Sequence, residues 1–184
     1  MNLWKEYLRW RHSKGFGVHS PYAYRFITDV LNPGRYGYYA YNQLHQLSRG
    51  QSIDRGDFYN KAEFLIRLAI FLHTKRIISY GTKSPVAQIV SRALKIVYYG
   101  CDVHSKLTFK PGDLLVIPKG VDPKATLINM AIENNVPVFA LNPGIQLRNI
   151  LKLPIKKGVL FTGKTKMLLI PREEMEYLSY PINL

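Results

Sequence analysis

The chain has 184 residues, a length that favours one domain with an appendage. Its composition, 47% hydrophobic and 21% charged, is typical of a soluble globular protein and excludes a disordered chain. The 26 lysines and arginines exceed the 12 acids, giving a net charge of +14, and the single cysteine, Cys101, excludes a disulfide framework or a cysteine-based zinc cluster.

No export signal or membrane span is predicted. Residues 1–11 alternate apolar and charged side chains, unlike the continuous apolar run of a signal peptide. The longest apolar stretches, 68–72 and 136–141, are far shorter than the roughly 20 residues that a transmembrane helix needs. We therefore expect a cytoplasmic protein with no membrane partner.

The first segment, residues 3–11, is predicted to be an amphipathic helix. Five residues share one face of this helix: Leu3, Trp4, Tyr7, Leu8 and Arg11. A glycine-broken loop over 14–19 follows, and it leads to Ser20, a good N-cap, and Pro21, which suits the first helical position.

The helix that begins at Pro21 has a regular apolar stripe, which predicts a buried face. The stripe consists of Tyr22, Ala23, Phe26, Ile27, Val30 and Leu31. Asn32-Pro33-Gly34 ends the helix. A tyrosine-rich turn is expected next, formed by Tyr36, Tyr38, Tyr39 and Tyr41.

A polar, glycine-containing linker is predicted over 49–57, followed by a helix over 58–73. The core side of this helix is expected to hold Phe58, Ala62, Leu65, Ile66, Ala69 and Ile70. We divide the chain here into an N-terminal helical cap, 1–56, and an α/β domain, 57–184.

From residue 75 onward, short apolar runs alternate with helical patterns, which predicts βαβ units and a mostly parallel sheet. The predicted strands are 77–80, 96–99, 114–117 and 136–141, and the predicted helices are 85–94 and 123–133. Ser84-Pro85 and Asp122-Pro123 repeat the capping device seen at Ser20-Pro21.

The C-terminal part predicts an antiparallel hairpin, with strands 159–162 and 165–170 joined by Gly163-Lys164 in a type II′ turn. Residues 158–165 also match the phosphate-binding pattern G-x-x-x-x-G-K-[ST]. That pattern functions only when a helix follows the lysine, and residues 166–170 favour a strand. We therefore predict the hairpin.

The turn at Ser79-Tyr80-Gly81-Thr82 is the best candidate binding site, because it lies where the first strand meets the first helix of the sheet. A glycine there lets a ligand approach the backbone, and a helix N-terminus favours anions. An ordinary βα turn explains the same residues, since one glycine stands where dinucleotide sites have three.

Other chemical groups are sparse. Asp102 is the acid nearest the second strand but lies beyond its expected end, and Cys101 is expected to be a small buried side chain. The five histidines show no metal-ligand spacing, and paired carboxylates are absent from the expected loop ends, so no catalytic or metal-binding residue is assigned. The tail acids, Glu173, Glu174 and Glu176, are expected to be solvated.

Residues Gly15 to Tyr24, with the sequence GFGVHSPYAY, and the tyrosines after them resemble the N-terminal helical segment of a group of bacterial class I S-adenosylmethionine-dependent methyltransferases. The likeness continues over 58–94, 114–131 and 158–171. It implies a reduced Rossmann-like fold, and S-adenosylmethionine as the cofactor if one binds, with Gly81 and Thr82 in its site.

The sequence departs from this family where the cofactor acids are expected. Ser79 replaces the acid of the first strand, and Tyr98 or Tyr99 replaces the ribose-binding acid of the second. Two later acidic positions read Pro118-Lys119 and Asn142-Pro143. The segment between Tyr99 and Leu114 is too short for the family's helix, strand and helix, so the sheet is expected to lack one strand.

Each lost ribose hydrogen bond costs roughly 1–3 kcal/mol, so two losses would weaken cofactor binding about 30-fold to several thousand-fold. We therefore expect a methyltransferase-like protein that is inactive and acts by binding a protein partner or a second copy. One alternative is an active methyltransferase that stacks the cofactor on Tyr80, Tyr98 or Tyr99. Another is an RNA-binding accessory protein, which the net charge and 13 tyrosines would suit.

Overall fold

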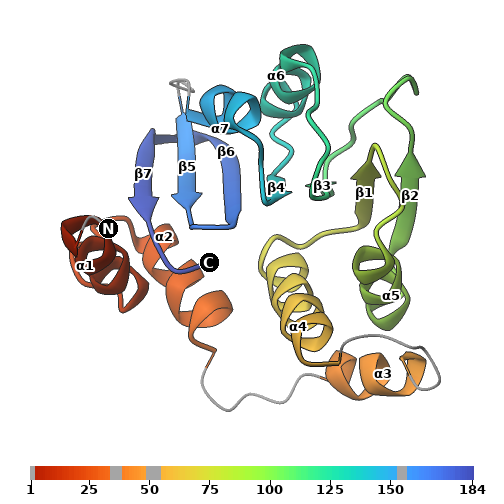
Figure 1. The fold of residues 1–184 in the computed structure, drawn as a ribbon, viewed down its shortest axis with the longest axis horizontal. Coiled ribbons are helices and arrows are strands. Elements are labelled where there is room, and N and C mark those ends of the chain that lie inside the picture. The colour runs from red at the N-terminus through yellow and green to blue at the C-terminus, as the bar shows by residue number, and fades with distance from the viewer. Residues whose placement is uncertain (1–2, 34–38, 49–54, 153–156) are drawn as a thin grey trace.

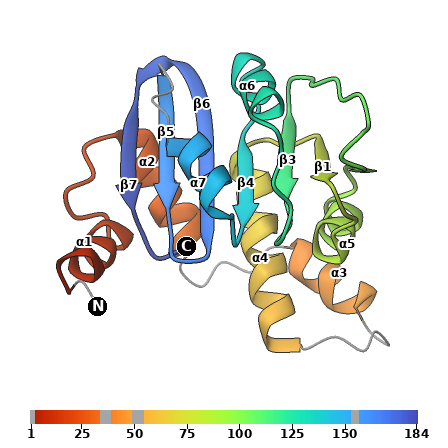
Figure 2. The same cartoon turned by 45° about the horizontal axis from the view of Figure 1, so that its top comes forward.

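A computed structural model describes residues 3–33, 39–48, 55–152 and 157–184. Within them the chain forms an α/β fold, in which a mixed seven-stranded sheet lies between two layers of helices (Figures 1 and 2). The helices are α1 Leu3–Ser13, α2 Pro21–Phe26, the π-helix η1 Ile27–Leu31, α3 Tyr39–Leu47, α4 Arg55–Phe71, α5 Pro85–Leu94, α6 Ala125–Glu133 and α7 Ile145–Lys152. None of the described helices is long and apolar enough to cross a membrane.

The strands are β1 Arg76–Tyr80, β2 Val97–Cys101, β3 Asp113–Ile117, β4 Val138–Leu141, β5 Lys157–Thr162, β6 Lys166–Glu176 and β7 Leu178–Pro181. Their order in the sheet is β2-β1-β3-β4-β6-β5-β7. β1 to β4 are mutually parallel, and β6 runs antiparallel to both β4 and β5. The predicted parallel sheet and the C-terminal hairpin are therefore confirmed.

The connection from β2 to β3 adds no strand to the sheet. Residues 102–112, all of them described, form no helix or strand, as the short spacing predicts. The sheet nevertheless has seven strands, because the unpredicted β7 adds to β5 at the opposite edge. The prediction that no additional strand forms between β2 and β3 is confirmed, whereas β7 was not predicted.

Each face of the sheet has its own hydrophobic core. On one face, α2, η1, α4 and α5 pack against alternate residues of the strands, and α3 packs on α4 and α5. On the other face, α6 and α7 cover the remaining strand residues. The Phe26 ring of α2 stacks on Phe161 of β5 with centroids 4.2 Å apart, so the N-terminal helices share the first core with the sheet.

Several local predictions hold at the level of single residues. Ser20 and Ser84 both cap their helices, accepting hydrogen bonds from the N–H groups of Ala23 and Ala87. The first helix after Pro21 ends at Leu31 as predicted, although its second half is a π-helix. The strand that follows Lys164 excludes a phosphate-binding loop, since no helix begins there.

Other local predictions are wrong. Thr162 pairs with Met167, and the Gly163 N–H donates to the Lys166 carbonyl at 2.8 Å, so the turn is centred on Lys164-Thr165 and not on Gly163-Lys164 as predicted. α6 begins at Ala125 and its N-cap is Lys124, so Asp122-Pro123 is not its cap. Ile70, expected on the core side of α4, is 39% exposed.

Two predicted loops are partly helical. Tyr39 and Tyr41 lie in α3 instead of a turn, while Tyr36 and Tyr38 fall outside the described residues. The predicted linker at 49–57 overlaps the first turn of α4, and its residues 49–54 are likewise not described. The three tail acids, Glu173, Glu174 and Glu176, lie on the exposed end of β6.

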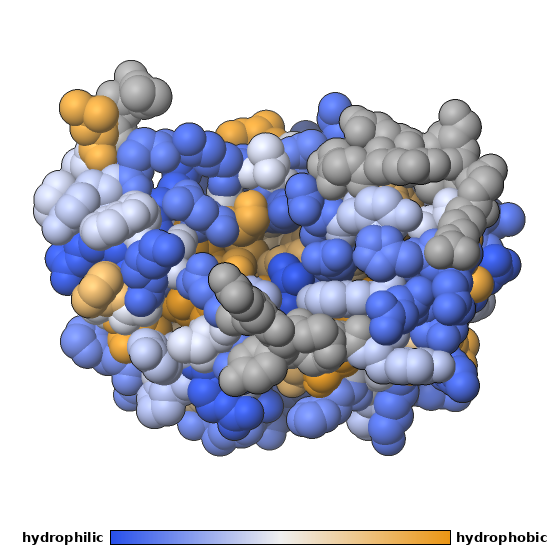
Figure 3. Space-filling model, turned by 90° about the horizontal axis from the view of Figure 1, so that it is seen from below, coloured by the Kyte–Doolittle hydropathy of each residue, from blue (hydrophilic) through white to orange (hydrophobic). Residues whose placement is uncertain are grey.

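The predicted amphipathic helix forms as α1, and much of its apolar face is exposed. Leu3 is 74% exposed, Trp4 64% and Tyr7 46%. The helix packs through its polar side instead. His12 contacts the Pro181 carbonyl of β7, Ser13 accepts the N–H of Asn183 just after β7, and Glu6 pairs with Lys164 in the β5–β6 turn. Seen from below, the surface is largely hydrophilic, with hydrophobic residues in a central hollow (Figure 3).

Candidate functional site

The candidate site lies at the carboxyl ends of β1 and β3, which are neighbours in the sheet. The chain leaves β1 toward β2 on one side and reaches β3 on the other side, so the strand order reverses at this point. In open α/β sheets, ligands bind in the crevice at such a reversal. Gly81 and Thr82, the predicted cofactor-binding residues, follow β1 here.

The polar groups of this turn are already used within the protein. The Gly81 N–H donates to the Cys101 carbonyl at 2.8 Å, and the Ser84 N–H donates to the Tyr98 hydroxyl at 3.1 Å. The Ser79 hydroxyl donates to the Thr82 carbonyl at 2.7 Å. A ligand would therefore have to displace internal hydrogen bonds to use these groups.

Val121 closes the crevice above Gly81. A Cβ atom built on Gly81 would lie only 2.6 Å from one methyl carbon of Val121 and 3.0 Å from the other. Val121 reaches this position because Gly120, with φ of 81°, turns the segment after β3 back toward β1. The sequence did not predict this contact, since nothing in the spacing brings the two residues together.

The structure corrects the position of Asp102. β2 ends at Cys101, which pairs with Tyr80, and not at Tyr99 as predicted. Asp102 therefore follows the strand end directly, level with Gly81, and its side chain is exposed. This is where an open α/β sheet places the acid that binds a ribose. Asp122, also exposed, follows β3, so the carboxyl edge has acids that the predicted strand ends missed.

The three candidate stacking tyrosines do not gather in one place. Tyr80 is 5% exposed, belongs to the core on the α6 side and donates its hydroxyl proton to the Val103 carbonyl at 3.0 Å. Tyr98 packs on the opposite core, and Tyr99 is 42% exposed at the edge of the sheet. Burial raises the pKa of Tyr80, so its hydroxyl stays protonated.

A surface cavity of about 410 Å³ lies beside Tyr80, between the β2–β3 connection and α6. Its floor includes Leu107 and Leu127, and Lys106 and Lys124 lie at its polar rim. A cavity with an apolar floor and a few polar groups is the usual form of a small-molecule site.

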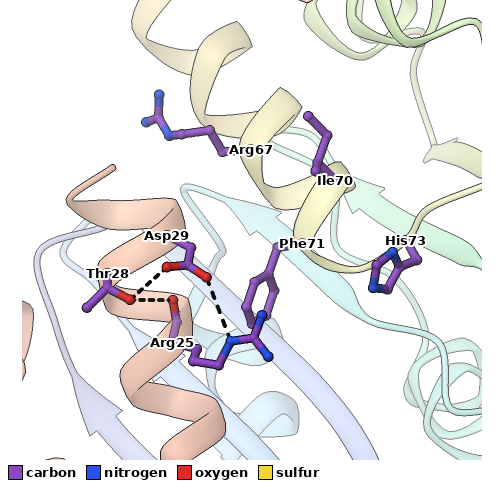
Figure 4. Close-up of a pocket in the computed structure, with 7 residues that line it drawn as sticks. All are labelled: Arg25, Thr28, Asp29, Arg67, Ile70, Phe71 and His73. Atoms are coloured by element: carbon purple, nitrogen blue, oxygen red, sulfur yellow. Dashed lines mark hydrogen bonds and ion pairs between the residues drawn. The ribbon is translucent and has the colours of Figure 1, made fainter. Parts of the chain in front are cut away.

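A second cavity, of about 250 Å³, lies between α2, η1 and the end of α4 (Figure 4). Arg25 lies 3.8 Å from Asp29, whereas the Arg67 side chain turns away and donates to the Val30 carbonyl and the Tyr41 hydroxyl. Because the two arginines do not converge, this cavity lacks a clear anion site.

Cys101 is buried, with its Sγ atom 3.6 Å from the Ser79 carbonyl oxygen. Burial raises the pKa of its thiol, because the thiolate would be poorly solvated. We expect iodoacetamide to label the folded protein at pH 8 at least about tenfold more slowly than the urea-unfolded chain.

The raised pKa also gives a direction for stability. The Cys101 thiol loses its proton less readily in the folded state than in the unfolded state. The free energy of unfolding is therefore unaffected by this thiol below its ordinary pKa. It falls as the pH rises from the ordinary pKa toward the raised one. Equal labelling rates in the folded and unfolded states would contradict the burial of Cys101.

Among the described residues, no three His, Cys, Asp or Glu side chains gather closely enough to hold a metal ion.

In a comparison with known proteins, no family model and no curated protein matches the chain.

Proposed function

We propose that the chain is a methyltransferase-like α/β protein of reduced Rossmann type that does not transfer methyl groups and acts by binding a partner. The observation that carries this proposal is Val121, whose methyl groups lie directly against Gly81, where a ligand would approach the backbone. The internal hydrogen bonds of Gly81 and Ser84 support it, because their N–H groups are not available to a cofactor.

Calorimetric titration with S-adenosylmethionine tests the proposal. The expected result is no saturable heat, which corresponds to a dissociation constant weaker than about 1 mM. Micromolar binding by the unaltered chain would contradict it. In Val121→Ala, the loss of two methyl groups opens the crevice, so a gain of weak binding in that variant alone would identify Val121 as the block.

An active methyltransferase with an atypical cofactor site is the second candidate. It is favoured by Asp102 at the end of β2 and by the cavity beside Tyr80. If the cofactor binds through Asp102, Asp102→Asn should weaken binding about tenfold or more, since a hydrogen bond to a charged group contributes roughly 1.5–3 kcal/mol. Glu133→Gln, which removes an exposed acid on α6, is the matched control and should leave binding unchanged.

A further inference from the structure

The polar side of α1 fixes the helix against the C-terminal edge of the sheet. The Asn183 N–H donates to the Ser13 hydroxyl at 2.7 Å, and His12 Nδ1 lies 3.1 Å from the Pro181 carbonyl oxygen. Lys164 forms an ion pair with Glu6 at 3.1 Å, and this contact lowers the pKa of Glu6. These three contacts hold α1 in a defined orientation.

That orientation directs the large side chains of the helix outward. The outward residues are Leu3, Trp4, Tyr7 and Trp10, which we call the aromatic ridge, with exposed fractions of 74%, 64%, 46% and 50%. Trp4, Tyr7 and Trp10 follow one another at intervals of three residues, which places them in one row along the helix, and Leu3 lies four residues before Tyr7 on the same face. Helix α1, which carries the ridge, lies at the outer end of the molecule beside β7 (Figures 1 and 2).

The charge around the ridge selects an anionic partner. Residues 3–14 contain four lysines and arginines and a single acid, Glu6, which is already paired with Lys164 and Arg9. A second copy would bring the same positive surface against itself, and like charges facing each other oppose association. An anionic surface has the complementary sign.

The ring geometry favours a lipid surface over a nucleic acid. Trp4 and Tyr7 have centroids 5.7 Å apart, and Tyr7 and Trp10 6.2 Å apart, with interplanar angles of 32° and 26°. A base inserted between two rings needs about 7 Å, the sum of two van der Waals contacts. The rings therefore shield one another's faces and are too close for bases to enter between them.

We propose that the aromatic ridge of α1 binds the surface of an anionic lipid bilayer. Tryptophan and tyrosine concentrate at the membrane–water interface, where basic side chains pair with anionic headgroups. That none of the described helices can span a membrane does not bear on this contact, because a helix lying on the interface does not cross the bilayer. The inference is independent of the cofactor crevice, so the titration with S-adenosylmethionine does not affect it.

Intrinsic fluorescence offers a direct test, because the only two tryptophans of the chain, Trp4 and Trp10, both lie on the ridge. Vesicles of phosphatidylcholine with phosphatidylglycerol should shift the emission to shorter wavelength, and brominated acyl chains should quench it. Phosphatidylcholine alone should give neither effect, and raising the salt concentration should reverse binding. No shift with the anionic vesicles, or an equal shift with neutral ones, would overturn the proposal.

Co-sedimentation with the same vesicles gives a second measurement. Trp4→Ala with Trp10→Ala should lower the partition coefficient at least about tenfold, since aromatic side chains supply most of the buried area. Tyr99→Ala is the matched control: Tyr99 is 42% exposed on β2, at the opposite edge of the sheet, and its loss should leave partitioning unchanged. An equal loss in both variants would overturn the proposal.

The fluorescence measurement also distinguishes lipid binding from nucleic-acid binding. Polyuridylate should leave the emission of the unaltered chain unchanged. Quenching by polyuridylate without binding to anionic vesicles would overturn the lipid proposal and assign the ridge to base stacking. Because the ridge side chains are exposed, the variants should retain the unfolding temperature of the parent chain, which circular dichroism checks.

Discussion

Replacing Phe161 with alanine is expected to lower the free energy of unfolding by about 3–5 kcal/mol. The side chain is fully buried on β5, stacks on Phe26 at 4.2 Å between centroids, and lies 6.1 Å from the Tyr180 ring. Its removal leaves a cavity between α2 and the sheet and breaks the aromatic pair that joins them. Urea denaturation followed by circular dichroism measures the loss.

Phe16→Ala is the matched control, because Phe16 has the same side chain but is 58% exposed. We expect its free energy of unfolding to differ from that of the parent chain by less than about 0.5 kcal/mol. Similar values for the two variants would mean that the N-terminal helices do not pack on β5 as described.

Replacing Arg76 with methionine is expected to lower the free energy of unfolding by about 3–5 kcal/mol, because it leaves the buried Asp113 carboxylate without its ion-pair partner. Arg76 Nε donates to Asp113 Oδ1 at 2.8 Å, and Arg76 Nη2 donates to Oδ2, while the Asp113 side chain is only 2% exposed. The hydrogen bond with Asp113 raises the pKa of Arg76, so the guanidinium stays charged over the whole working range of pH.

The same pair holds the β2–β3 connection. Arg76 Nη2 donates to the Thr108 carbonyl, and the Lys110 N–H donates to Asp113 Oδ2. The variant should therefore loosen residues 102–112, which hydrogen exchange would detect as faster exchange at Lys110.

Two comparisons identify the cause of the Arg76→Met loss. Adding Asp113→Leu should recover much of the stability, since the uncompensated charge disappears. Arg25→Met breaks an ion pair in which both side chains are about half exposed or more, at 74% and 47%, and should change stability by less than about 1 kcal/mol. A loss in Arg76→Met no larger than in Arg25→Met would contradict the burial of Asp113.

Residues that act locally made much of the fold predictable. Ser20-Pro21 and Ser84-Pro85 start helices because each serine accepts an N–H from the first turn, whatever lies around it. The apolar runs at 77–80 and 114–117 became central strands because they are buried on both faces. β7, by contrast, has only four residues of mixed polarity and forms by pairing with β5.

The candidate site was less predictable, because it depends on contacts between distant segments. Gly81 and Thr82 were placed correctly at the end of β1. The contact of Val121 with Gly81 depends on how the segment after β3 turns, and the position of Asp102 depends on the register of β2 with β1. Neither leaves a periodic pattern in the sequence.

The sequence alone determined the helices that follow Ser20 and Ser84, the runs that form the parallel strands, and that no further strand lies between β2 and β3. Only the tertiary structure decided which side of α1 faces the protein. The periodicity shows that Leu3, Trp4 and Tyr7 share a face, but burial of that face requires an apolar surface to receive it. β7 and the C-terminal residues offer carbonyl and N–H groups instead, and hydrogen bonding to these groups turns the polar side of α1 inward.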